Sequence, residues 1–139
     1  MESWIVGAQH HAEEQRVRAD DSRNDAEDLL SFMLVNLRDK LKPLGKVKLL
    51  DEVATKAVAY YDRRGLDLGD AELLKRALAR RNLGDVLSME GDANSALREF
   101  RASLEIDEAL VAKDPSNTAV LVDVALSREK IGNVVRPAP

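Results

Sequence analysis

The chain has 139 residues and no cysteine, with 45% hydrophobic residues, 33% charged residues and a formal net charge of −4. This composition suits one globular domain, the mild acidity offers no electrostatic surface to nucleic acid, and the missing thiols exclude disulfides and thiolate metal sites. Because no apolar run could cross a bilayer and the first residues lack the basic region of a signal peptide, we expect a cytoplasmic protein that does not insert into membranes.

Helical periodicity fills the segments between the glycines and prolines, and no strand-like alternation occurs. In chain order, the predicted helices cover about residues 8–41, 47–63, 70–90 and 92–113, and a fifth helix follows Asp114-Pro115. The connections are short, so successive helices should be antiparallel neighbours. We therefore expect an all-α fold of about five helices, including a long N-terminal helix.

Capping residues predict where several of these helices begin and end. Asp70 is the predicted N-cap of the third helix, with Glu72 in its first turn to complement the dipole. Gly91 is the predicted C′ glycine at the end of that helix. Asp114 and Pro115 read as the N-cap and N1 residues that open the fifth helix.

The long first helix has two different halves. Residues 13–28 are almost all charged or polar, and residues 1–25 are predicted to form a solvated helical extension, a frayed end or a linker, although Val17 and Ala26 would make a poor coiled-coil seam. The second half is apolar and opens a domain over 26–135, which a disordered tail at 136–139 follows. Its predicted core residues are Leu29, Leu30, Phe32, Met33, Leu37 and Leu41.

Residues 80–100, RRNLGDVLSMEGDANSALREF, have a spacing that amphipathicity alone does not require. Gly84 and Ala96 are small where two antiparallel helices would touch, and Phe100 would fill the wedge between them one turn further on. The pattern Leu-Gly, Ala, Phe resembles the tetratricopeptide repeat (TPR) family, whose helix–turn–helix unit carries W-x2-L-G-x2-Y, then A-x3-F, then P. The resemblance implies antiparallel helix-pair repeats stacked into a TPR-like α-solenoid.

The sequence departs from the family pattern in ways that suggest a long-helix variant. Arg80 and Leu87 occupy the tryptophan and tyrosine positions, and the proline comes late, at Pro115. Ile131-Gly132 repeats the Leu-Gly pair downstream, and Gly45 matches Gly91 in a degenerate upstream copy. The chain therefore reads as one degenerate repeat, one good repeat and the first helix of a third.

The stretch from Phe32 to Tyr61, followed by the long repeat, resembles the C-terminal repeat region of large multidomain bacterial signalling proteins. In those proteins such repeats follow kinase-like, caspase-like or TIR-type modules. The resemblance implies that this chain is a part of a longer protein and that its charged N-terminal helix is the linker.

In the TPR family, the first helix of each pair lines a concave groove in which peptides lie. The resemblance therefore implies a non-catalytic interaction module that binds a protein or peptide partner, in which Arg81 grips a carboxylate of the partner. The alternative for Arg81 and Asp85 is an i,i+4 ion pair on a solvated surface. The implied groove residues are Leu74, Leu78, Arg81, Asp85, Ser88, Met89, Glu129 and Asn133.

A second function remains open, a structural element that makes the chain a homo-oligomer through its terminal helices. The predicted fifth helix carries more apolar residues than one neighbouring helix should cover, and Trp4-Ile5-Val6 is a further candidate contact. The apolar residues of the fifth helix are Val120, Val124, Ile131, Val134 and Val135.

Catalytic and metal-binding motifs are missing from the sequence. His10, His11, Glu13 and Glu14 are the one candidate metal cluster, but they lie in a polar segment that reads more simply as a solvated patch. There is no P-loop, no G-x-G-x-x-G and no G-x-S-x-G. We therefore expect no enzyme activity, no cofactor and no metal.

Overall fold

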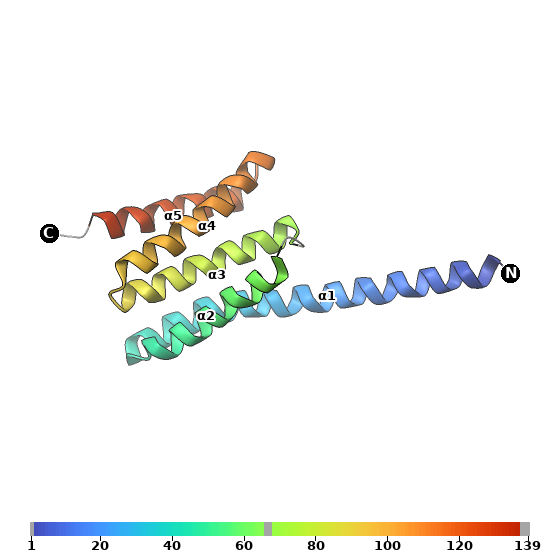
Figure 1. Ribbon diagram of the computed structural model, residues 1–139, viewed down its shortest axis with the longest axis horizontal. Helices are drawn as coiled ribbons and strands as arrows, with labels where there is room; N and C mark the ends of the chain where they lie inside the picture. The colour runs from blue at the N-terminus through green and yellow to red at the C-terminus, as the bar shows by residue number, and fades with distance from the viewer. Residues whose placement is uncertain (1, 66–67, 137–139) are drawn as a thin grey trace. The chain divides into compact units, whose positions relative to one another are not determined.

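The computed structural model describes residues 2–65 and 68–136, with side chains from residue 9 onward. These residues form five α-helices, one short 3-10 helix and no strand, which confirms the all-α prediction (Figure 1). The side chains of Trp4-Ile5-Val6 and the end of the predicted tail at 137–139 lie outside the described residues. The helices are α1 (Glu2–Leu41), η1 (Lys42–Leu44), α2 (Val47–Arg64), α3 (Asp70–Met89), α4 (Ala93–Lys113) and α5 (Thr118–Val135).

The chain divides into two units, Met1–Leu30 and Ser31–Pro139. In the first unit, every side chain from residue 9 to residue 19 is exposed. Ion pairs along the helix join His10 to Glu14 at 3.1 Å and Arg16 to Glu13 at 3.4 Å. Such pairs, one helical turn apart, favour a helix in water by a few tenths of a kcal/mol each, at roughly 0.2–0.5.

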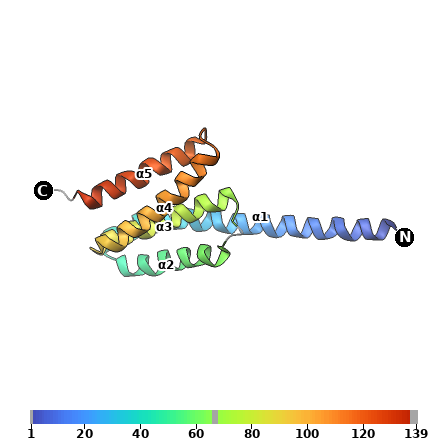
Figure 2. The same ribbon diagram turned by 45° about the horizontal axis from the view of Figure 1, so that its top comes forward.

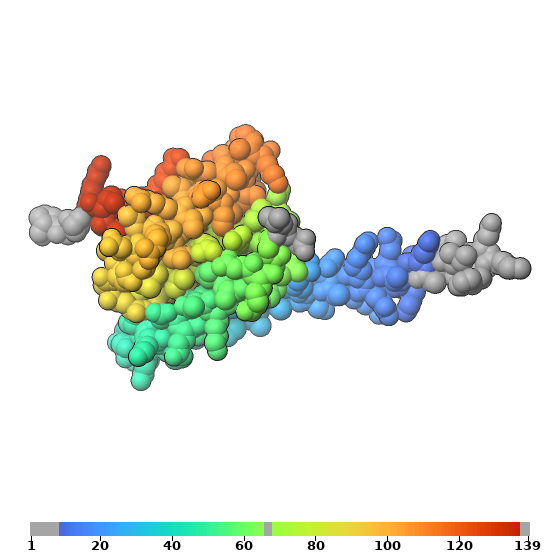
Figure 3. Space-filling view, viewed as in Figure 1, coloured from blue at the N-terminus to red at the C-terminus, as the bar shows by residue number. Residues whose placement is uncertain are grey.

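In the second unit, α3 packs between α2 and α4, and α4 packs on α5, so that successive helices lie side by side (Figures 1 and 2). Their side chains form a continuous surface over α2, α3 and α4 on the face seen in Figure 3. Five of the buried hydrophobic residues are alanines, which allow the helices to approach closely. The buried alanines are Ala54, Ala57, Ala77, Ala79 and Ala96.

Gly84 makes room for an aromatic ring. A Cβ atom placed on Gly84 would lie 2.5 Å from Cε1 of Phe100, and the nearest atoms to that position all belong to the Phe100 ring. The sequence had suggested that Gly84 faces Ala96 and that Phe100 fills a wedge one turn away. In the structure Ala96 is buried, but the residue that lies on Gly84 is Phe100 itself.

The turn between α3 and α4 confirms the prediction for Gly91. This residue has φ +83°, and hydrogen bonds run from Asp92 N to Leu87 O at 3.0 Å and from Gly91 N to Ser88 O at 3.1 Å. These two bonds define a Schellman motif, which requires a left-handed residue at C′. The Asp92 carboxylate then caps α4 by accepting from Ser95 N at 3.1 Å.

Two predicted helix starts are wrong. Gly69 is the N-cap of α3, and Asp70 lies inside the first turn. Helix α5 begins at Thr118, after Asn117, whose side chain accepts from Val120 N at 3.4 Å. Asp114 instead accepts bonds from the backbone N and hydroxyl of Ser116, at 3.2 and 2.7 Å, and so closes a turn before the helix.

The apolar faces of two helices also differ from the predicted ones. On α1, Leu34 is 2% exposed, whereas Leu29, Phe32 and Met33, predicted as core, are 58%, 65% and 43% exposed. On α5, Val120 and Val124 are buried, so α4 does cover them. Val135 is 54% exposed, as predicted. The other open apolar residues of α5 are Leu121, Val122 and Leu126, which we call the outer face of α5.

Candidate binding groove

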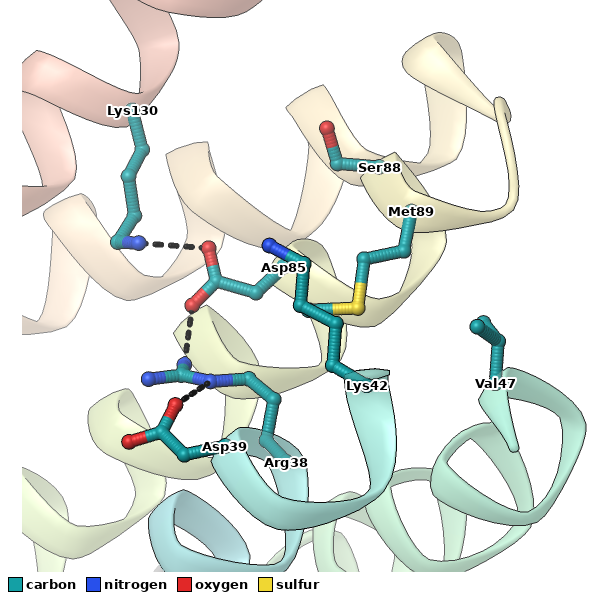
Figure 4. A pocket seen from close by; sticks show the side chains of 8 residues that line it. All are labelled: Arg38, Asp39, Lys42, Val47, Asp85, Ser88, Met89 and Lys130. Atoms are coloured by element: carbon teal, nitrogen blue, oxygen red, sulfur yellow. Dashed lines mark hydrogen bonds and ion pairs between the residues drawn. The ribbon is translucent and has the colours of Figure 1, made fainter. Parts of the chain in front are cut away.

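The end of α1, the start of α2, α3 and α5 surround an open cavity of about 640 Å³ (Figure 4). A second cavity of about 330 Å³ shares Asp85, Ser88 and Lys130 with the first and extends it to Asn133 and Val134. We call the two together the α1–α3–α5 groove. The first cavity is lined by Arg38, Asp39, Lys42, Val47, Asp85, Ser88, Met89 and Lys130.

Asp85 ties three helices together at the centre of this groove. Nη1 of Arg38, from α1, donates to Oδ2 of Asp85 at 2.5 Å, and Nζ of Lys130, from α5, donates to Oδ1 at 2.6 Å. Arg38 also lies 3.5 Å from Asp39 (Figure 4). Because both Asp85 oxygens are engaged in charge-assisted bonds, this side chain holds the walls of the groove in place.

The groove has an excess of positive charge. Arg38, Lys42 and Lys130 contribute three cations against the two carboxylates of Asp39 and Asp85. The Lys42 side chain is exposed and makes no hydrogen bond or ion pair within the described part of the chain, while the Lys42 carbonyl accepts from Gly45 N at 3.1 Å. The Lys130 ammonium also lies 6.0 Å from the centre of the Phe100 ring, the ring that packs on Gly84.

The structure brings together half of the residues that the TPR resemblance implied. Asp85, Ser88 and Met89 line the first cavity, and Asn133 lines its extension. Leu74 lines a separate cavity with Asp70 and Leu110. Leu78 is half-buried and Glu129 is exposed, and neither lines the α1–α3–α5 groove.

Arg81 does not have the exposed position that a peptide contact requires. It is 6% exposed, and its Nη2 lies 3.4 Å from Oδ1 of Asp123 on α5. The alternative, an Arg81–Asp85 surface pair, is wrong as well, because Asp85 pairs with Arg38 and Lys130. The sequence pattern could not reveal this, because the partner of Arg81 lies on another helix far along the chain.

The cations of the groove were missed by the sequence interpretation, although a signal for one of them exists. In the upstream repeat, where Gly45 matches Gly91, Lys42 falls on the position of Ser88 and Asp39 on that of Asp85. Carrying the groove positions onto that degenerate copy would have found both residues. Arg38 and Lys130 have no such signal, since their matches are Gly84 and Asn82.

Six of the eight residues that line the first cavity are polar or charged. Among the described residues, no three His, Asp or Glu side chains are placed to hold a metal ion, and His10 pairs with Glu14. In the same part of the chain, no helix is both long and apolar enough to cross a membrane.

The chain matches no protein-family model, no curated protein and no solved structure.

Proposed function

We propose that this chain is a non-catalytic protein-interaction module that binds an acidic peptide segment of a partner protein in the α1–α3–α5 groove. The observation that carries the proposal is the groove itself, which α1, η1 and α5 line with the cations Arg38, Lys42 and Lys130, while α3 adds Asp85, Ser88 and Met89. It is open along its length, and a peptide is the kind of ligand that reaches polar groups on several helices at once.

The proposal includes a TPR-like arrangement of the second unit. Its support is local: a Schellman turn at Gly91 and the contact of Gly84 with Phe100 join α3 and α4 as one antiparallel pair. Helices α1, α3 and α5 would be the first members of successive pairs, which is the position of groove-lining helices in that family. The resemblance to bacterial signalling proteins extends the proposal to a scaffold within a larger protein.

The lining suggests the chemistry of the ligand. Lys42 is available to a carboxylate, the exposed Ser88 hydroxyl can donate or accept, and Met89 and Val47 add apolar surface beside them. A peptide with a carboxylate next to an apolar residue would match both the polar and the apolar part of this lining. Arg38 and Lys130 would orient it indirectly, because both are engaged on Asp85.

Fluorescence anisotropy with a labelled Glu- and Leu-rich peptide tests this proposal, with the same peptide carrying Gln for Glu as the chemical control. Lys42→Glu reverses the charge of the available cation, and we expect it to weaken binding by about tenfold or more, in line with the loss of a charged contact of roughly 1–3 kcal/mol. The matched variant Lys56→Glu changes an exposed lysine of α2 outside the groove and should bind normally. Equal affinity for both peptides, or equal effects of the two variants, would refute the proposal.

A second candidate function, structural self-association, is favoured by a different observation. The outer face of α5 exposes Leu121, Val122 and Leu126 on one helix. Adjacent exposed apolar side chains on a helix often mark an interface. In this alternative the cover is another copy of the chain, within an oligomerisation element of a larger signalling protein.

A further inference from the structure

Helices α3, α4 and α5 meet at three charged side chains inside the second unit, which we call the buried charge cluster: Arg81, Asp107 and Asp123. Asp107, on α4, is 0% exposed. Neither of its carboxylate oxygens, nor Nη1 of Arg81, has a hydrogen-bond partner among the described residues. Within the described residues, the hydrogen bond that joins the cluster is the one from Nη2 of Arg81 to Oδ1 of Asp123, at 3.4 Å.

A layer of neutral polar groups continues the cluster by one helical turn. The Ser103 hydroxyl, on α4, donates to the carbonyl of Ala77 on α3 at 2.8 Å and lies 3.4 Å from the hydroxyl of Ser127 on α5. Ser103 and Ser127 are both fully buried. The charged groups that face Asp107 are therefore Arg81 from α3 and Asp123 from α5, while its own helix contributes the neutral Ser103.

The charge of the cluster depends on one proton. With Asp107 ionised, the fully buried carboxylate of Asp107 and the partly buried carboxylate of Asp123 share a single guanidinium, which is unfavourable. With Asp107 protonated, one cation faces one anion, and the carboxyl gains an O–H donor for its neighbours. Burial, and then the charge of Asp123, raise the pKa of Asp107 to about 7, against the opposing effect of Arg81.

We propose that the buried charge cluster is a proton-controlled latch that holds α5 against α3 and α4 when Asp107 is protonated and loosens it when Asp107 is ionised. The latch does not depend on the proposed peptide binding. It would nevertheless reach the α1–α3–α5 groove, because α5 carries Lys130, which holds Asp85 at 2.6 Å.

Proton linkage determines whether the closed state of α5 becomes more or less stable as the pH rises. Detaching α5 removes Asp123 and admits water, so the pKa of Asp107 should fall toward the ordinary aspartate value of about 3.9, whereas in the closed state it is about 7. The closed state therefore binds more protons between these two values, and its stability falls as the pH rises through that window and is constant above it. Between about pH 6 and pH 8, the equilibrium for opening α5 should rise by about tenfold.

Hydrogen exchange of the α5 amides, corrected for the intrinsic rate at each pH, tests the latch on the whole chain without any ligand. The wild type should show the tenfold rise in opening, and Asp107→Asn, which stays neutral, should remove it. The control Glu105→Gln neutralises an exposed carboxylate of the same helix and should keep the wild-type response. A pH response that survives in Asp107→Asn would overturn the proposal.

A second measurement keeps the test valid if Asp107→Asn folds poorly. Carbon-13 NMR of the carboxyl groups in the wild type should show Asp107 titrating near pH 7, as its raised pKa requires. Asp123→Asn removes the facing negative charge and should move that midpoint to lower pH. A midpoint near the ordinary aspartate value, about 3.9, would refute the latch directly.

Discussion

At Gly84 the backbone of α3 touches the ring of Phe100, so one added methyl group has nowhere to go. The Cβ of Gly84→Ala would lie 2.5 and 2.6 Å from two ring carbons of a side chain that is itself buried. A planar ring enclosed by two helices cannot swing aside as a flexible chain can. Residues with a side chain at this position must therefore move α3 and α4 apart.

We expect Gly84→Ala to lower the free energy of unfolding by about 1–3 kcal/mol, the usual cost of overpacking a core. Gly132→Ala is the matched control, because Gly132 also lies inside a helix but has no atom within 4 Å of the added Cβ. There the same change should stabilise the chain by about 0.5–1 kcal/mol. Urea denaturation measures both, and equal effects at the two glycines would contradict the packing described for Phe100.

A second prediction for a single residue concerns Arg81. Replacing it by Met removes the one cation that faces Asp107 and Asp123, and losing one partner of a buried pair typically costs about 3–5 kcal/mol. The cost should be smaller at pH 6 than at pH 8, because protonated Asp107 does not need the cation. Arg128→Met, which breaks an exposed pair with Glu108, should cost less than about 1 kcal/mol in the same denaturation experiment.

At the scale of whole helices, the turn at Gly91 determines how α3 ends. Gly91 has a φ of +83°, which glycine adopts readily and asparagine less readily. Other residues lose about 1–2 kcal/mol of stability in this left-handed conformation. Thermal unfolding should therefore rank the variants wild type, Gly91→Asn, Gly91→Ala in order of decreasing stability. If Gly91→Ala melts above Gly91→Asn, the left-handed turn is not what limits this helix end.

The helices show what a sequence can and cannot predict. Gly91 was predictable because its conformation follows from local chemistry. Asp114 was misassigned because an aspartate before Pro115 suits either an N-cap or the turn with Ser116 that it actually closes. The groove was only partly predictable: Ser88 and Met89 follow from the repeat register, whereas the burial of Arg81 depends on packing against α5, which no local pattern contains.

For the whole molecule, the distribution of charge matters more to the proposed peptide binding than the net charge does. The chain has a formal net charge of −4, yet Arg38, Lys42 and Lys130 give the α1–α3–α5 groove a positive balance. Under the proposed function, an acidic peptide would be attracted locally by the groove and repelled at long range by the net charge of the chain. This arrangement favours short-range recognition over electrostatic steering, and binding should weaken as salt screens the groove.

The outer face of α5 decides between the two proposed functions. Val122 is 57% exposed beside Leu121 and Leu126. A second copy that covers these side chains would bury apolar surface, which stabilises the association by about 25 cal/mol per Å².

If the chain self-associates there, light scattering should show a mass that rises with concentration, and Val122→Glu should return it to the monomer at every concentration. Val17→Glu places the same charge on an equally exposed valine of α1 and should leave the association unchanged. Peptide binding that persists in monomeric Val122→Glu would place the two functions on separate surfaces, while a wild type that is monomeric throughout would rule out self-association through α5.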